Sequence, residues 1–188
     1  MRRLRRRMYQ WIGTALAVAL FVAATASPGL ALDKKQLNSD ASAALSRLYS
    51  NTPSAKVLGG KAKAILIFPK IRKAGFMVGA QGGNAVLRRG GKTVGSYNNV
   101  AASYGFQAGV QSFSYVLFLM TDSAREYLDK SNGWELGTGP SLVVLDKGKA
   151  KSLSTTTLKD DVYAFIFGQK GLMGGIGIQG SKVTKIKR

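Results

Sequence analysis

The sequence contains no histidine and no cysteine, and only nine of its 188 residues are acidic. Without cysteine and histidine, disulfides, lipid-modified cysteines, zinc sites of the Cys/His type and imidazole-assisted nucleophiles are all excluded. A serine with a lysine base remains as an option. However, Ser152 with Lys151 and Ser181 with Lys182 are adjacent in sequence, so in a strand each pair points to opposite faces. The composition therefore predicts a protein that is not an enzyme.

Long apolar runs are also scarce. Trp11–Ala24 is an apolar segment of about fourteen residues, whereas a bilayer span needs about twenty. Five arginines precede it within residues 2–7, and the helix-breaking Ser27-Pro28-Gly29 follows. This pattern predicts a signal peptide at residues 1–31, cleaved after Ala31 or alternatively after Ala26, with an uncleaved membrane anchor as the other interpretation. The expected product is an exported, periplasmic protein whose residues 32–188 form a single domain.

Basic residues are abundant, with 28 lysines and arginines in the whole chain. Loss of the leader would leave 23 basic residues against nine acidic ones, a net charge of about +14. Such an excess favours anionic partners such as phospholipid headgroups or lipopolysaccharide phosphates, although a merely solvated basic surface is the alternative. Nucleic acid is not expected, because exposed aromatic residues do not alternate with the cations. The candidate lipid- or anion-binding residues are Lys61, Lys63, Lys70, Arg72, Lys73, Arg88, Arg89, Lys92, Lys182, Lys185 and Lys187.

Apolar periodicity predicts helices first and strands afterwards. Residues 33–50 form an amphipathic pattern with one narrow apolar stripe, which indicates a helix that packs on a sheet or, alternatively, lies on a membrane. From residue 64 to residue 188 the pattern is β-rich. Pro69 is expected to end a buried strand at 64–68, and Gly82-Gly83 and Gly90-Gly91 are expected at hairpin turns. Residues 124–128 form a short helix between strands.

The predicted fold is α+β, with N-terminal helices packed on a strongly curved, barrel-like antiparallel sheet of about eight to ten short strands. So many strands in about 125 residues would expose long edges, which strong curvature or closure removes. Glycines within the strands agree with curvature and with close approach of neighbouring backbones.

Two further patterns resemble ligand sites, but their sequence context does not favour that interpretation. Gly175–Gly180 matches G-x-G-x-x-G, but the chain ends eight residues later without the helix and acidic residue that a dinucleotide site requires. We therefore predict a glycine-rich strand there. Asp122, Glu126 and Asp129 share one face of the short helix and could hold a hard cation, but Arg125 or Lys130 beside them favours solvated ion pairs. No cofactor or metal is expected.

Several segments together resemble the SYLF (Ysc84-type) domain over residues 35–187. They are Phe68-Pro69-Lys70, Ala74-Gly75-Phe76, Tyr104–Gly109, Tyr115-Val116-Leu117, Asp122-Ser123-Ala124, Gly137–Pro140, Tyr163-Ala164-Phe165 and Lys170–Gly175. The resemblance implies lipid binding, since eukaryotic members bind phosphoinositide membranes and some bind actin. The small exported bacterial members are the most similar, and for an exported chain actin is not an expected partner.

These observations lead to one functional hypothesis and one alternative. We expect a non-enzymatic exported protein that lies peripheral to a membrane, binds anionic phospholipid and contributes to maintenance of the cell envelope. The alternative is an interaction or structural module that binds another envelope protein through its β-sheet.

Overall fold

The computed structural model describes residues 33–130, 134–135, 138–145, 159–172 and 181–186. The predicted signal peptide, the Gly175–Gly180 motif and Lys187 lie outside these ranges. Residues 34–188 form one compact unit. Among the helices described, none combines the length and the apolar character needed to cross a bilayer.

Two helices cover one face of the sheet. Helix α2 (Lys34–Asn51) buries its apolar stripe, which includes Leu37 and Leu48. Helix α3 (Pro53–Lys61) follows at once and begins with proline, whose missing N–H and fixed φ suit the first helical position. Both helices pack on apolar residues of the sheet such as Phe118, so the amphipathic pattern of residues 33–50 is used for packing inside the domain.

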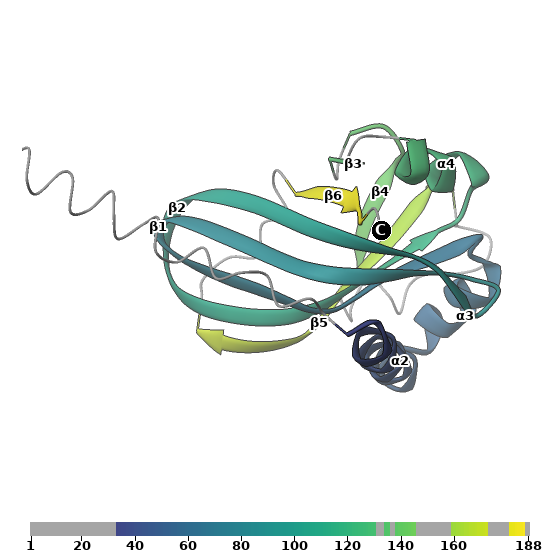
Figure 1. Cartoon of the computed structure of the whole chain (residues 1–188), viewed down its shortest axis with the longest axis horizontal. Coiled ribbons are helices and arrows are strands. Elements are labelled where there is room, and N and C mark those ends of the chain that lie inside the picture. The colour runs from purple at the N-terminus through teal and green to yellow at the C-terminus, as the bar shows by residue number, and fades with distance from the viewer. Residues whose placement is uncertain (1–32, 131–133, 136–137, 146–158, 173–180, 187–188) are drawn as a thin grey trace, which may run out of the picture. The chain divides into compact units, whose positions relative to one another are not determined.

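The sheet is built around one long hairpin. Strand β1 (Ala64–Arg89) and strand β2 (Lys92–Leu119) pair antiparallel along almost their whole length. Gly90 and Gly91 form the turn with φ values of 53° and 77°, as a two-residue hairpin turn requires. Figure 1 shows the two strands running away from the helices, bending, and returning.

The bend brings the two halves of β1 together. Pairing with β2 shifts register between Phe68 and Ile71 and between Phe76 and Val78, where bulges allow a strand to bend. A Cβ added at Gly83 would lie 2.6 Å from the carbonyl oxygen of Lys70 and 3.2 Å from Ile71 Cα. The absence of a side chain at Gly83 therefore lets the returning half of β1 rest on its own first half.

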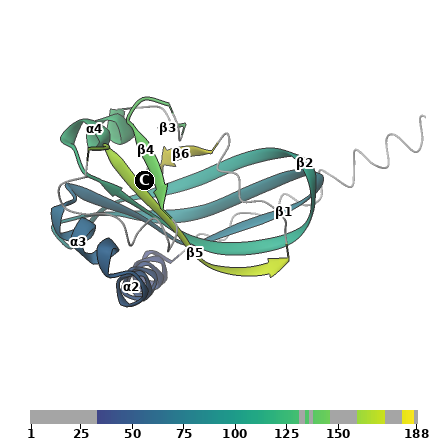
Figure 2. The ribbon, with the colours of Figure 1, turned by 180° about the vertical axis from the view of Figure 1, so that it is seen from behind.

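One short helix and four shorter strands complete the fold around the long hairpin. Helix α4 (Asp122–Lys130) and strands β3 (Trp134–Glu135), β4 (Leu142–Leu145), β5 (Val162–Leu172) and β6 (Lys182–Lys185) follow in the chain. The sheet order is β3-β6-β2-β5-β4, with β1 on the other side of β2. Residues of both halves of β1, including Phe68 and Leu87, share one core with Trp134 and with Leu128 of α4. Figures 1 and 2 show α2 and α4 on opposite sides of the sheet.

The predicted α+β class with helices on a strongly curved sheet is confirmed. Six strands are assigned in the part described, and the two longest each take in several of the short segments that the sequence suggested. Pro69 does not end its strand, because it lies at a register shift where a ladder hydrogen bond is not needed. Gly82-Gly83 likewise lies inside β1, and Gly83 allows the close approach to Lys70. One pair, β4 with β5, is parallel rather than antiparallel.

Candidate functional site

Three neighbouring strands carry a row of polar and basic side chains on the outer face of the sheet. Arg72 of β1 lies opposite Ser112 of β2, which lies opposite Lys170 of β5. Residues directly opposite one another point to the same side, so Arg72 and Lys170 are separated by two strand spacings, about 10 Å. Both side chains are exposed. We call this row, with Lys70 and Val110, the Arg72–Lys170 face.

The two additional members extend the row along the strands. Lys70 lies two residues before Arg72 and is exposed. Val110 lies two residues before Ser112 and is 66% exposed, the highest value among the exposed large hydrophobic residues. Gly171 adopts a φ of 97°, and its backbone approaches the Val110 carbonyl oxygen so closely that a Cβ would collide with it. The backbone at the end of β5 is therefore fitted closely to β2 beside Lys170.

The cations of this face have no acidic partner in the part of the chain that the structure describes. The ion pairs seen there join Lys63, Arg125, Lys130 and Lys185 to Asp122, Glu126 and Asp129. Lys70, Arg72 and Lys170 are absent from this set, so their charges are available to an external anion. Adjacent exposed valine and unpaired cations form the combination that suits an interfacial membrane contact.

The other predicted basic residues lie in different places. Lys61, Arg89, Lys92 and Lys182 are exposed at the end of α3, at the hairpin tip and on β6. Arg88 faces α2 instead, where its Nη2 donates to the Asn38 carbonyl oxygen at 3.1 Å and to Ser42 Oγ at 2.7 Å. Its guanidinium therefore fastens the returning half of β1 to α2.

Lys73 lies on the inner face of the sheet and is 1% exposed. A one-residue step along a strand reverses the side-chain direction, so Arg72 points outward and Lys73 inward. Lys73 lies opposite Gln111, and Gln81 and Asn99 are buried on the same inner face. Among the described residues, both amide atoms of Asn99 and the Oε1 of Gln111 have no hydrogen-bond partner. The interior near the bend is polar, and Lys73 does not contribute to the exposed face.

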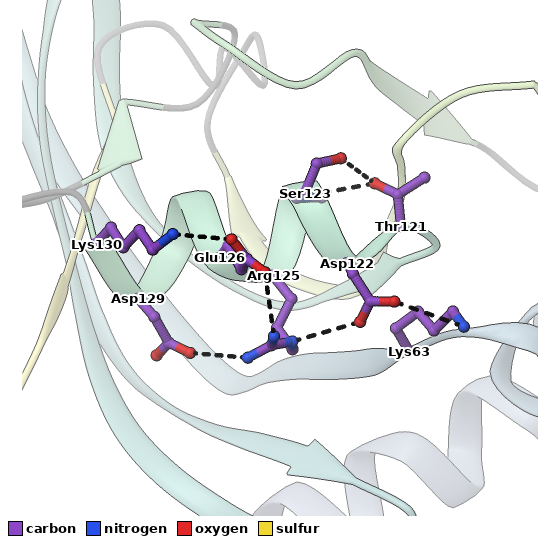
Figure 3. A network of polar contacts seen from close by, with 9 residues as sticks. Lys63, Thr121, Asp122, Ser123, Arg125, Glu126, Asp129 and Lys130 are labelled. Atoms are coloured by element: carbon purple, nitrogen blue, oxygen red, sulfur yellow. Dashed lines mark hydrogen bonds and ion pairs between the residues drawn. The ribbon is translucent and has the colours of Figure 1, made fainter.

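Helix α4 carries three acidic residues that form ion pairs with nearby cations, and Figure 3 shows this network around Arg125. Arg125 lies 3.7 Å from Asp122 and 3.4 Å from Asp129, measured between nitrogen and carboxylate oxygen. Lys130 pairs with Glu126 at 2.9 Å. The three carboxylates therefore form ion pairs with side-chain cations, including the Arg125 and Lys130 that the sequence analysis favoured as their partners.

Two more lysines reach this network from elsewhere in the chain. Lys63 pairs with Asp122 at 3.7 Å and Lys185 with Asp129 at 3.1 Å. Burial alone would raise the pKa of Asp129, but hydrogen bonds from Tyr97 and Lys185, together with the charges of Lys185 and Arg125, outweigh it and lower the pKa. Burial and the bond to Asp129 raise the pKa of Tyr97. Lys63 and Lys185, both predicted as anion-binding residues, thus already bind carboxylates.

Of the four named residues of the Arg72–Lys170 face, the sequence analysis listed Lys70 and Arg72 as candidates and did not list Lys170 or Val110. Lys170 stands alone among uncharged residues, so no local cluster marked it. Only the pairing of β5 with β2 places it in line with Arg72. The exposure of Val110 opposes the usual expectation for an apolar residue in an alternating strand, and no sequence signal predicted it.

Comparisons with known proteins agree with the sequence resemblance. The Ysc84 family, described as "Las17-binding protein actin regulator", matches residues 100–188, which include most of β2 and all of α4 to β6. Beta cell expansion factor A of Aeromonas veronii is 33% identical over 149 residues, which are 78% of this chain and 54% of that protein. The chain thus spans about half the length of this relative. Residues 100–188, just under half of the chain, match the Ysc84 (SYLF) family, and this match supports a lipid- or protein-binding domain of a family not known for enzymes.

Proposed function

We propose that this protein binds membrane surfaces rich in anionic phospholipid through the Arg72–Lys170 face. The observation that supports this most directly is a set of three exposed cations, Lys70, Arg72 and Lys170, beside the 66% exposed Val110; these cations have no acidic partner among the described residues. Headgroup phosphates need point charges rather than a shaped pocket, and an exposed apolar side chain adds shallow insertion. No chemical step is required of the protein in this role.

The expected strength follows from the number of groups in contact. Each lysine or arginine near an anionic surface contributes about 1 kcal/mol, and burial of one valine side chain contributes about 1.5 kcal/mol. The face alone would then supply about 4 to 5 kcal/mol, which corresponds to a dissociation constant near the millimolar range. We therefore expect reversible, salt-sensitive adsorption, strengthened where additional exposed cations reach the same surface.

The test compares vesicles that differ only in charge. Protein lacking residues 1–31 would be sedimented with vesicles of phosphatidylcholine alone or with one third phosphatidylglycerol, at low and high salt. We expect binding to the anionic vesicles at low salt and strong reduction at high salt, because salt screens surface charge. Equal sedimentation with both vesicle types would contradict the proposal.

We further propose that the protein acts in the periplasm, peripheral to a membrane, and contributes to envelope maintenance. Support comes from the sequence of residues 1–31, which has the charged, apolar and small-residue regions of a signal peptide. The mass of the protein recovered from the periplasm checks this directly. Removal of 31 residues is expected, and recovery of the uncleaved chain in the membrane fraction would instead support an N-terminal anchor.

A sheet-edge protein contact is the second candidate. Among the described strands, β1 pairs only with β2, which leaves its other edge without a strand partner there. Such an edge can accept a strand from another protein. A pull-down of envelope proteins in the absence of lipid would favour this candidate if vesicles fail to bind and one partner is recovered specifically.

A further inference from the structure

A cavity of about 550 Å³ lies between the end of α2 and strand β5. Arg47, Leu48 and Asn51 line it from α2, and the segment Phe165–Lys170 lines it from β5. Leu145 of β4 also contributes. Its volume is in the range of sites that hold one small-molecule ligand.

The lining separates into an apolar interior and a basic rim. Leu48, Leu145 and Phe165 are each no more than 3% exposed, and Phe167 is half-buried. Arg47 and Lys170 are exposed and have no acidic partner among the residues that the structure describes. A ligand that matches this arrangement has an apolar body and a negatively charged end.

Two polar groups at the cavity already have partners inside the protein. Ser114 Oγ donates to the Pro69 carbonyl oxygen at 2.8 Å, and Asn51 Nδ2 donates to the Arg47 carbonyl oxygen at 2.8 Å. The single donor of Ser114 is therefore used, and Asn51 uses one of its two N–H groups while its exposed side chain leaves the other to water, so an apolar chain can lie beside them without leaving a buried donor unpaired. The guanidinium of Arg47 and the ammonium of Lys170 remain for the charged end of the ligand.

We propose that this cavity holds a single-chain anionic amphiphile, with its hydrocarbon chain against Leu48, Leu145 and Phe165 and its acidic group between Arg47 and Lys170. This goes beyond adsorption to a membrane, since one molecule is held individually. It does not require the Arg72–Lys170 face, with which it shares only Lys170. A free fatty acid and a lysophospholipid both have this chemistry, and the experiment separates them.

The primary experiment titrates the purified protein with palmitate or lysophosphatidylglycerol, each below its critical micelle concentration, by isothermal calorimetry. Hexadecanol serves as the uncharged chain and acetate as the head group without a chain. We expect saturable binding with one ligand per protein for at least one of the two anionic amphiphiles, and at least tenfold weaker binding of hexadecanol and acetate. The preferred anionic ligand identifies the source. Absence of saturable binding by both would overturn the proposal.

Matched variants test the position of the site. Asn51→Trp adds a bulky side chain at the cavity wall, while Ala43→Trp adds the same group at an exposed position of α2 outside it. We expect Asn51→Trp to reduce amphiphile binding at least tenfold and Ala43→Trp to leave it unchanged, with equal melting temperatures for the two variants. Equal binding by both variants would place the ligand elsewhere and overturn the proposal.

Reciprocal charge variants separate this site from the membrane-binding face. Arg47→Glu should weaken amphiphile binding about tenfold or more and leave vesicle binding unchanged. Arg72→Glu should weaken vesicle binding and leave amphiphile binding unchanged. If the unchanged protein binds palmitate or lysophosphatidylglycerol but does not bind anionic vesicles, only the proposed membrane-binding function is wrong. If Arg47→Glu binds palmitate and lysophosphatidylglycerol as strongly as the unchanged protein, the cavity proposal is wrong.

Discussion

The α4 network and the Arg72–Lys170 face both contain several cations, but they differ in what those cations contact. In the network, Asp122, Glu126 and Asp129 are paired with Arg125, Lys130, Lys63 and Lys185. On the face, no carboxylate pairs with the cations in the ranges described. The difference shows that a chain's charge excess is not spread evenly. Three of the nine acidic residues lie on α4 and pair with cations there, whereas the described cations of the Arg72–Lys170 face have no such partner.

The paired cations also link distant parts of the chain. Lys63 precedes β1 and Lys185 lies in β6, yet both contact α4. Each exposed ion pair contributes little to the free energy of unfolding. Together these pairs connect the start of β1 and strand β6 to helix α4. Within the part of the chain that the structure describes, the cations of the Arg72–Lys170 face make no such pairs. The same residue type thus serves assembly in one region and is available for a partner in the other.

The largest expected difference between the regions is in membrane binding. The double substitution Arg72→Gln with Lys170→Gln removes two unpaired cations, each contributing about 1 kcal/mol near an anionic surface. We expect about a 30-fold loss of affinity for anionic vesicles, measured by sedimentation at low salt. The matched control is Lys63→Gln with Lys185→Gln, which removes the same charge from the α4 network. If both double variants lose the same affinity, net charge rather than the face governs binding.

A smaller effect, on stability, is expected in the opposite region. Arg125→Ala removes the cation shared by Asp122, Glu126 and Asp129, and its side chain is 23% exposed. We expect the free energy of unfolding to fall by about 1 kcal/mol, measured with urea, and the loss to shrink at high salt. Lys130→Ala, whose side chain is 78% exposed, is the control and should cost only a few tenths of a kcal/mol. Vesicle binding should remain unchanged in both variants.

The smallest expected effect is a change in acid sensitivity near α4. Hydrogen bonds from Thr121 Oγ1 and from the backbone N–H of Ser141 lower the pKa of Asp161. A carboxyl with a depressed folded-state pKa stabilises the fold above its unfolded value, about 3.9, and this contribution is lost as pH falls through the folded-state pKa. In Asp161→Asn, stability should therefore fall less steeply below about pH 4.

Urea unfolding at several pH values measures this change. Asp40→Asn, at an exposed carboxylate of α2, is the control for loss of one acidic group. An acid dependence in Asp161→Asn that matches the unchanged protein would show that these hydrogen bonds do not favour the ionised form.

Patterns within single segments predicted much of the fold. The apolar stripe of α2 predicted both a helix and its buried face, and Gly90-Gly91 predicted a turn that needs positive φ. These predictions succeed because helix periodicity and turn conformation depend on neighbouring residues.

Predictions that depend on distant residues were less complete. Val110 is exposed and Gln111 is buried, although hydrophobicity alone favours the opposite orientation. Lys73 follows Arg72 in the sequence but points inward. A residue in a basic sequence cluster is therefore not always exposed to a partner. Pro69 and Gly83 lie inside a strand because a bulge and a close backbone contact accommodate them.

The α+β class, the resemblance to the Ysc84 (SYLF) family and the strongly basic charge can all be read from the sequence. Which cations have carboxylate partners depends on the folded structure. The strand register brings Lys170 into line with Arg72, and the α4 carboxylates pair with Lys63 and Lys185. The physical reason is that charge is a property of each residue, whereas exposure and pairing depend on contacts between segments far apart in the chain.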